Sequence, residues 1–251
     1  MIIYGNDFSD KDVEFSRKNG LGLEVLRYAS PIFADNFAKN REAVSKTLEG
    51  VKGAAMHGAY NDTYYTSVDP LICEVARKRF LQSMEIAQAH GIGGVVFHSA
   101  YRKFLNGGSA ASIEKYVKTA VEFWREIPIP QGLTVYIENV EDEDPEVFKQ
   151  LFTGIDRPEI RCCLDIGHAF FNGRSVSLNR WIDVLKDYIG HVHIHDNNGV
   201  FDEHLPLGQG GMNLTGAINK IMHACGEDVP FVLECDVESS VKWLRDIGYD
   251  V

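Results

Sequence analysis

The sequence predicts an α/β protein with a (β/α)8 barrel fold, arranged as one domain over residues 1–251. Short apolar runs rich in Val, Ile and Tyr alternate along the chain with longer segments of helical period. There are eight of each, and strands that are almost continuously apolar are typical of a parallel sheet covered on both faces. No linker, repeat or low-complexity stretch divides the chain, whose length suits eight strand-helix units.

The elements follow in order. The predicted strands are IIYG near residue 2, LGLEVLRY from Leu21, GAAMH from Gly53, GVVFH from Gly94, LTVYIE from Leu133, IRCCLD from Ile160, HVHIH from His191 and PFVLE from Pro230. The predicted helices cover residues 9–19, 36–49, 70–90, 110–126, 144–153, 177–188, 214–225 and 238–247. The third helix has the clearest signals, because Asp69-Pro70 opens it and Gly91 closes it. Its expected core-facing stripe is Leu71, Ile72, Val75, Leu81 and Met84.

Charge and composition exclude several classes of protein. The chain has 25 basic and 36 acidic residues, a net charge of −11 with His neutral, which disfavours a general nucleic-acid binder. No apolar stretch is long enough to span a membrane and no secretion signal opens the sequence, so a cytoplasmic protein without membrane partners is expected. The five cysteines contain no CxxC motif and are interpreted as reduced thiols.

Six consecutive predicted strands end in a residue that can bind a metal or transfer a proton. These residues are His57, His98, Glu138, Asp165, His193 and Glu234. In a (β/α)8 barrel the carboxyl ends of the strands converge on one mouth, where the active site lies. Imidazole with carboxylate, and no thiolate, indicates a catalytic site for a divalent ion such as Zn or Mn.

Further candidate ligands follow two of these strands. His168 lies three residues after Asp165, and Asp202 and His204 have a two-residue spacing that would aim both side chains the same way in an extended segment. Nine candidates exceed what one ion can use, so one to three ions per chain are expected. The alternation of His191, His193 and His195 places all three on one face of their strand, which we expect to point inward.

The strings CLDIGHAF, HIHD and DEHLPLGQG resemble the xylose isomerase-like TIM barrel superfamily, which includes endonuclease IV, and the similarity covers nearly the whole chain. The resemblance to endonuclease IV implies a trinuclear zinc cluster. Its nine ligands would be His57, His98, Glu138, Asp165, His168, His193, Asp202, His204 and Glu234.

Two departures favour another branch of the superfamily. Glu138 is followed by Asn139-Val140 and the acidic run EDED, and residues 59–69 contain no Lys or Arg, so a DNA backbone is disfavoured here. The IENV, HIHDN and DEHLPLGQG strings are more similar to the sugar phosphate isomerases and epimerases. In that group Glu138, Asp165, His193 and Glu234 would form the core site for one metal ion.

The resulting hypothesis is a metal-dependent isomerase or epimerase of a small sugar or sugar phosphate. Glu138 and Glu234 would transfer protons and His168 would hold the substrate, with Tyr60, His195 and Asp196 as further substrate contacts. The alternative is an endonuclease IV-like multinuclear zinc phosphodiesterase, acting on abasic-site DNA or a small phosphoester. A barrel that senses or carries a ligand without catalysis is a third possibility. A homo-oligomer is possible because relatives of this fold often form dimers or tetramers.

Overall fold

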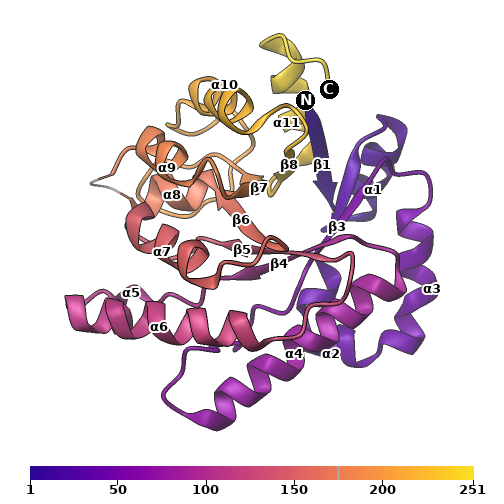
Figure 1. Ribbon diagram of the computed structural model, residues 1–251. Coiled ribbons are helices and arrows are strands. Elements are labelled where there is room, and N and C mark those ends of the chain that lie inside the picture. The colour runs from indigo at the N-terminus through magenta and orange to yellow at the C-terminus, as the bar shows by residue number, and fades with distance from the viewer. Residues whose placement is uncertain (174–175) are drawn as a thin grey trace.

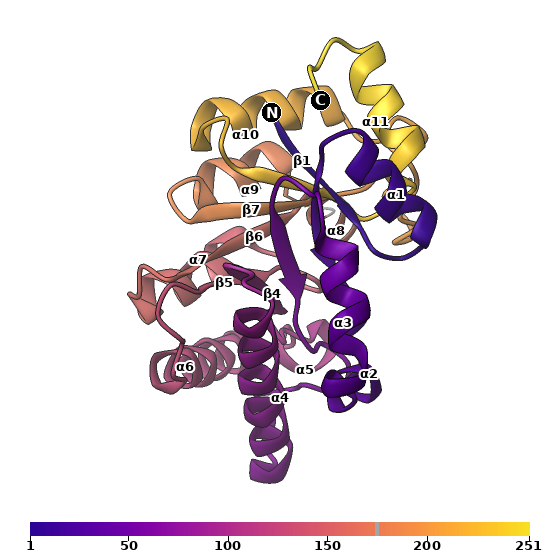
Figure 2. The ribbon, with the colours of Figure 1, turned by 90° about the vertical axis from the view of Figure 1, so that its right-hand side faces the viewer.

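The computed structural model describes residues 1–173 and 176–251 and confirms the (β/α)8 barrel. Eight parallel strands pair in sequence order, and β1 pairs with β8 to close the barrel. The strands are β1 (Ile2–Asn6), β2 (Gly22–Val25), β3 (Ala54–His57), β4 (Gly94–His98), β5 (Thr134–Glu138), β6 (Ile160–Asp165), β7 (Ile189–Ile194) and β8 (Pro230–Leu233). Because closure joins the first strand to the last, the two chain ends lie near each other (Figures 1 and 2).

The long helices lie within a few residues of the predicted ranges and surround the strands (Figure 1). They are α1 (Asp10–Lys18), α3 (Phe37–Leu48), α4 (Pro70–Ala89), α6 (Ala110–Glu126), α7 (Pro145–Ile155), α9 (Leu178–Leu185), α10 (Leu214–Cys225) and α11 (Val237–Asp246). Short helices also occur in the loops, namely the 3-10 helix Arg27–Ala29, α2 (Pro31–Asp35), α5 (Lys103–Asn106) and α8 (Ile166–Asn172). Within the described residues, no helix has the length and apolar character that a membrane crossing requires.

Helix α4 begins and ends as predicted, but the predicted core-facing stripe is wrong for its first turns. Pro70 opens the helix, and the Asp69 side chain accepts a hydrogen bond from the Leu71 backbone N–H. Met84 is fully buried, whereas Leu71 is 70% exposed and Val75 is 51% exposed. The amino-terminal part of α4 extends past the neighbouring elements (Figure 2), which agrees with the exposure of its apolar side chains.

An aromatic layer between α4, α6 and the barrel supports the strands that carry the mouth residues. Phe80 stacks on Phe97 of β4 with ring centroids 4.2 Å apart and on Trp124 of α6 at 5.5 Å. All three side chains are buried. Burial of each contributes about 1.5–3 kcal/mol relative to exposure, which fixes these helices against β4.

A polar network continues from this layer to the loops above the barrel. The Tyr65 and Tyr116 hydroxyls donate to the Ser99 carbonyl oxygen over 2.5 and 3.0 Å. Trp124 Nε1 donates to the Tyr65 hydroxyl, and Ser99 Oγ donates to Asp142 Oδ2 over 2.7 Å. The loops after β3, β4 and β5 are therefore joined directly behind the mouth. Burial raises the pKa of Asp142 to about 7, despite the hydrogen bond from Ser99.

This pKa predicts how Asp142→Asn changes stability. Between about pH 4 and pH 7 Asp142 ionises in the unfolded chain but stays protonated in the folded protein, so it makes folding less favourable as pH rises. Asparagine removes this dependence. We expect the difference in unfolding free energy, variant minus parent, to rise by about 1–3 kcal/mol over this range and then to level off. Urea titrations at pH 5 and pH 8 measure the difference.

The matched control is Asp228→Asn, because Asp228 is exposed in a turn. The stability of that variant relative to the parent protein should not change with pH. The difference in unfolding free energy between Asp142→Asn and the parent protein could also be constant between pH 4 and pH 7. That result would mean that Asp142 ionises in the folded protein as it does in the unfolded chain.

Candidate functional site

The structure brings the predicted strand-end residues to one rim of the barrel. His57, His98, Glu138 and Asp165 are the last residues of β3, β4, β5 and β6. His193 is one residue inside the end of β7, and Glu234 lies one residue beyond β8. The parallel register aligns neighbours directly, with His98 opposite Glu138 and Asp165 opposite His193. The short distances between these side chains follow from that register.

A cavity of about 590 Å³ opens at this rim, which is within the usual range for a small-molecule site. Seven of the nine predicted ligands line it: His57, His98, Glu138, His168, Asp202, His204 and Glu234. The other two, Asp165 and His193, are fully buried and are not among its lining residues. The nine residues therefore form a mouth and a layer beneath it.

The two oxygens of Glu138 contact different groups of imidazoles. Oε2 lies 3.2 Å from His57 Nε2 and 3.5 Å from His98 Nε2. Oε1 lies 3.4 Å from His193 Nδ1 and 3.3 Å from His168 Nδ1. One carboxylate therefore links the imidazoles of β3 and β4 to those of α8 and β7.

Glu138, Asp165, His193 and Glu234 form a group whose ligand atoms all lie within 4.8 Å of one another. His193 Nδ1 is 3.1 Å from Glu234 Oε1, but neither His193 Nδ1 nor Asp165 Oδ2 has an aligned hydrogen-bond partner among the described residues. Buried polar atoms left unpaired are costly. Three carboxylates and an imidazole with unused lone pairs at this spacing fit a divalent cation.

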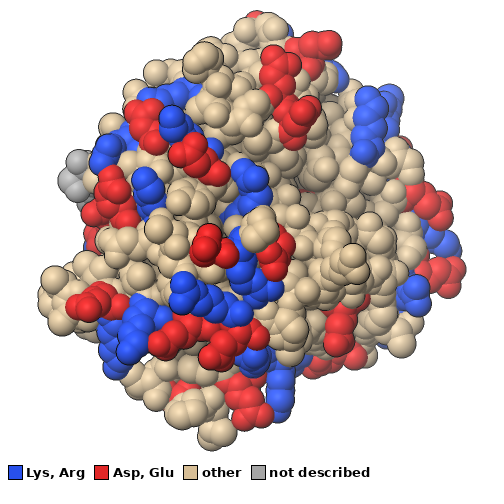
Figure 3. All heavy atoms as spheres, viewed as in Figure 1, with Lys and Arg blue, Asp and Glu red and all other residues tan. Residues whose placement is uncertain are grey.

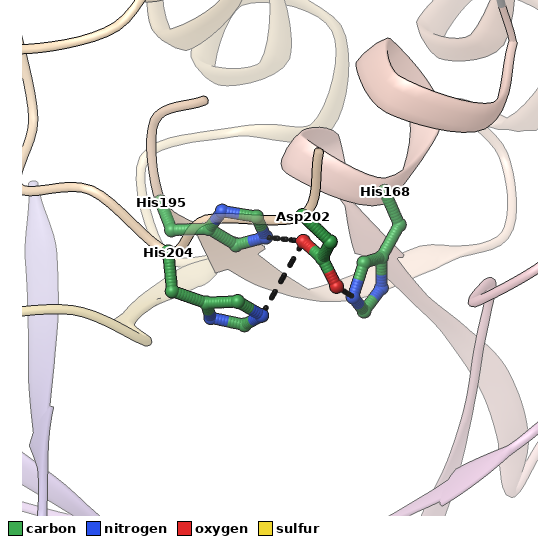
Figure 4. A group of neighbouring side chains, drawn as sticks. All are labelled: His168, His195, Asp202 and His204. Atoms are coloured by element: carbon green, nitrogen blue, oxygen red, sulfur yellow. Dashed lines mark ion pairs between the residues drawn. The ribbon is translucent and has the colours of Figure 1, made fainter. Parts of the chain in front are cut away.

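A second group lies beside it and is drawn in Figure 4: His168, His195, Asp202 and His204. Asp202 is at the centre, with His168 Nε2 at 3.2 Å from one oxygen and His204 Nε2 at 3.4 Å from the other. The expected extended segment is wrong at His204, whose φ of 47° lies in the left-handed region. Asp202 and His204 still meet, although the segment that carries them is not extended throughout.

His168 reaches this group through a short helix. Asp165 caps α8 by accepting a hydrogen bond from the His168 backbone N–H over 2.7 Å. The His168 ring also contacts the Asn139 carbonyl oxygen through Nδ1, at 3.0 Å. The chain thus turns into a helix as soon as it leaves β6, and the cap fixes the direction in which His168 enters the mouth.

The two glutamates of the mouth have pKa values displaced in opposite directions by the surrounding side chains. Burial alone would raise the pKa of Glu138, but the charge of His193 and the contacts with His168 bring it well below its ordinary value. Burial raises the pKa of Glu234 and outweighs the opposing effect of His193, while Glu138 and Asp165 raise it further. Paired carboxyls with separated pKa values are the usual arrangement for acid and base roles.

The histidines of the mouth also differ in charge. Burial lowers the pKa of His98 to about 3, so its ring is neutral. Burial would also lower the pKa of His168 and His204, but nearby carboxylates reverse this. Asp165 and Asp202 raise the pKa of His168 well above its ordinary value, and Asp202 with Glu234 raises that of His204 to about 9.

The three expected substrate contacts occupy different positions relative to the cavity. Tyr60 lines the cavity, where its ring stacks on His98 with centroids 4.8 Å apart. His195 is fully buried and stacks on His204 at 3.8 Å. Asp196 is 1% exposed and accepts hydrogen bonds from the backbone N–H groups of residues 197, 208, 210 and 212. Its carboxylate therefore holds the loop that follows His204 instead of facing the cavity.

Sequence reasoning missed the side of the mouth formed by β1 and β2. Asp7, Phe8 and Arg27 line the cavity there. Arg27 Nε lies 3.2 Å from Asp7 Oδ2, and its Nη2 lies 3.1 Å from Asp10. A signal was available, because Asp7 comes shortly after the first predicted strand and Arg27 lies next to the last residue of the second.

The chain is similar to known proteins both in sequence and in fold. The profile of the family described as xylose isomerase-like TIM barrel matches residues 14–247. A zinc-soaked protein from Thermus thermophilus superposes with a TM-score of 0.75 and 20% identity, covering 99% of this chain and 98% of that one. A D-tagatose 3-epimerase-like protein gives 0.74 and 20%, covering 98% and 96%. At these identities the superpositions establish a common fold.

The relatives found by sequence combine low identity over most of the chain with higher identity over a short part of it. A probable endonuclease 4 from Natronomonas pharaonis is 27% identical over 243 residues, covering 88% of this chain and 84% of the relative. An uncharacterized protein from Methanocaldococcus jannaschii is 38% identical over 86 residues, and this match spans only 33% of the chain and 32% of that relative.

The position of Asp196 predicts that Asp196→Ala destabilises the loop beside His204. The substitution removes the buried carboxylate that accepts these backbone N–H groups, so we expect the free energy of unfolding to fall by about 2–4 kcal/mol. Limited proteolysis should also cut residues 197–212 faster. Chemical denaturation and mass spectrometry of the fragments measure the two effects.

The control is Asp183→Ala, which removes an exposed ion pair with Lys220. It should change the unfolding free energy by less than about 1 kcal/mol. If the two variants unfold alike, the hydrogen bonds of Asp196 contribute nothing specific to this loop.

Proposed function

The chain belongs to the xylose isomerase-like TIM barrel family, and we propose that it is a divalent-metal-dependent isomerase or epimerase of a small sugar or sugar phosphate. The observation that carries the proposal is the pair Glu138 and Glu234. Both lie at one small cavity and in one potential metal group, with pKa values displaced in opposite directions. The shared fold with a D-tagatose 3-epimerase-like protein is consistent with this chemistry.

The residues that would hold the ion are Glu138, Asp165, His193 and Glu234. A bound divalent ion, zinc or manganese, would act as a Lewis acid on a substrate carbonyl and its neighbouring hydroxyl, and so make the adjacent C–H bond more acidic. The carboxylate oxygens and the imidazole nitrogen of these four residues suit either metal. Five further candidate ligands at the same mouth allow one to three ions per chain: His57, His98, His168, Asp202 and His204.

The two glutamates would divide the proton transfer between them. Glu138, ionised because of its histidine neighbours, is suited to remove a proton from the substrate carbon. Glu234, whose pKa is raised, is suited to return a proton. His168, protonated and lining the cavity, would donate a hydrogen bond to a substrate oxygen, and Tyr60 would cover the sugar from the β3 side.

The surroundings of the cavity support a small substrate. Among the described residues, Arg27 is the one Lys or Arg that lines it, and Asp7 and Asp10 both pair with this side chain. On the face in Figure 3, acidic and basic side chains alternate and do not gather into a basic surface. A long nucleic acid needs an extended basic surface, whereas a single sugar phosphate needs only a local site.

A second candidate function is phosphodiester hydrolysis of the endonuclease IV type. The observation in its favour is that the potential ligands form further groups, His57 with His98 and Glu138, and His168 with His195, Asp202 and His204. Several ions could then stabilise the attacking and leaving oxygens of a displacement. The sequence similarity to a probable endonuclease 4 also supports this second candidate function.

The charge state of the mouth predicts that zinc binding releases protons. His193, His168 and His204 carry raised pKa values, and each of them must lose a proton before it can bind a metal. We therefore expect zinc affinity to rise about tenfold or more per pH unit between pH 6 and pH 8. Calorimetry in two buffers with different ionisation enthalpies counts the protons, and elemental analysis counts the ions.

His98 provides a matched control for proton release. Its ring is already neutral, so His98→Ala should weaken binding without changing the number of protons released, whereas His204→Ala should reduce that number. Less than about one metal ion per chain in protein purified without chelators would overturn both enzyme proposals.

The proton-transfer role predicts that Glu234→Gln lowers turnover by about 10²- to 10⁴-fold. The reaction would be followed on a panel of ketoses and sugar phosphates in deuterium oxide, where a product that has exchanged a proton carries deuterium on the carbon beside the carbonyl. Glu227→Gln, at an exposed position, is the control, and variants are compared at equal metal content.

Two outcomes would count against this proposal. If Glu234→Gln keeps full turnover, Glu234 is neither the acid nor the base of the reaction. Nicking of abasic-site DNA by the metal-loaded protein, without deuterium incorporation into any sugar, would favour the phosphodiesterase.

A further inference from the structure

An acidic side chain lies in the barrel interior beneath the proposed metal group. Glu24, in β2, is fully buried and is not among the residues that line the cavity. His191 Nε2 contacts Glu24 Oε2 at 2.8 Å, within a hydrogen bond. His193 Nε2 lies 3.1 Å from Glu24 Oε1, an ion-pair distance rather than an aligned hydrogen bond. Both partners come from β7, two residues apart on its inward face.

The surrounding side chains hold Glu24 and His191 in place. His191 stacks on Tyr136 of β5 with ring centroids 4.7 Å apart and meets the edge of Tyr4 of β1 at 6.3 Å. Glu24 itself pairs in register with Asn6 of β1. The backbone of Glu24 is therefore fixed by its pairing with β1, and its carboxylate points to β7, where one oxygen faces His191 and the other faces His193.

We propose that Glu24 is a positioning residue that makes His193 present Nδ1 to the metal. The inference rests on the proposed function and concerns the layer below its ligands. His193 Nδ1 already faces Glu138 Oε1 at 3.4 Å and Glu234 Oε1 at 3.1 Å, while Nε2 faces Glu24. The two ring nitrogens thus lie between the candidate metal ligands on one side and Glu24 on the other.

The chemistry of the groups explains the assignment. A neutral imidazole carries one N–H and one bare nitrogen, and an ionised carboxylate can only accept hydrogen bonds. Glu24 Oε1 faces His193 Nε2 at 3.1 Å, whereas Nδ1 faces the oxygens of Glu138 and Glu234. When His193 binds a metal with one proton left on its ring, that proton belongs on Nε2, beside the acceptor oxygen of Glu24, and Nδ1 is bare. Metal-binding histidines commonly have such a carboxylate behind them, which fixes the tautomer and increases ligand basicity.

Glu24, His191 and His193 could instead bind an ion themselves, since their ligand atoms also lie within 4.8 Å. A tetrahedral zinc ion holds neighbouring ligand atoms about 3.3 Å apart. The 2.8 Å between His191 and Glu24 is shorter and is the length of a hydrogen bond, whereas the contacts of His193 Nδ1 above are close to the tetrahedral spacing. The distances favour a shared proton beneath the site and an ion above it.

Glu24→Gln is the direct test, because the amide has nearly the same shape but only one acceptor oxygen. Its NH2 group must face one of the two histidines, and if it faces His193 it favours the tautomer with Nδ1 protonated. We expect the affinity for one equivalent of zinc to fall about 10- to 100-fold. Competition with a chromophoric chelator measures it, and any further equivalents should bind as before.

His191→Gln is the matched control. Its side-chain NH2 can still donate to Glu24 Oε2 and leaves Glu24 Oε1 free to face His193, so zinc affinity should change by less than about threefold. Unchanged zinc affinity in Glu24→Gln would overturn the inference and leave the proposed function intact. Failure of the parent protein to bind zinc would overturn both.

A second measurement does not depend on the folding of a variant. The zinc-loaded parent protein, labelled with ¹⁵N-histidine, reports by NMR which nitrogen of each ring carries a proton. The inference requires His193 to carry its proton on Nε2 and its metal on Nδ1. The opposite arrangement, or zinc on Nε2, would overturn it even if Glu24→Gln proved too unstable to purify.

Discussion

The central constraint on this structure is the burial of the Glu138 carboxylate among imidazoles. A lone carboxylate with no access to water would be costly, and it would protonate instead of staying charged. Glu138 avoids this because its two oxygens lie within 3.5 Å of four histidines from β3, β4, α8 and β7. The ends of these elements must therefore stay in register with β5. Closure of the barrel and the aromatic layer behind β4 keep that register.

The same constraint limits the chemistry of the mouth. Glu138 belongs to two potential metal groups at once, so neither group can be changed without affecting the other. Its pairing with Glu234 suits proton transfer, and its bridging position suits a multinuclear centre. The two proposed activities are therefore alternative uses of one carboxylate. The cavity of about 590 Å³, with one arginine that is already paired, is the feature that favours a small sugar.

Much of the fold and the donor set could be predicted from the sequence, because both depend on local pattern. Strand ends are marked by a change from apolar to polar residues, and the barrel fold places such ends together. Short helices are different. Seven residues of α8 make barely two turns, too few to show helical period, so the way His168 enters the mouth was not predictable. The hydrogen bonds of Asp196 were not predictable for another reason, since the four backbone N–H groups that donate to its oxygens are brought together only by the folded loop.

Glu24 illustrates the least predictable kind of site residue. It lies inside an apolar strand, with no motif around it, and its partners His191 and His193 come from the opposite end of the sequence, 167 residues or more away. Barrel interiors are normally filled with branched apolar side chains, so a Glu and a His in this layer reduce the apolar contacts available to the core. Their mutual hydrogen bond offsets the desolvation of the polar groups, but an apolar pair would avoid that desolvation altogether. A polar pair in this layer is understandable if it serves the site above, because ionised Glu24 adds a negative charge behind His193 and so favours a cation at Nδ1. The barrel thus places ligands at its rim and their support one layer deeper, with Glu24 on a strand that contributes none of the candidate ligands.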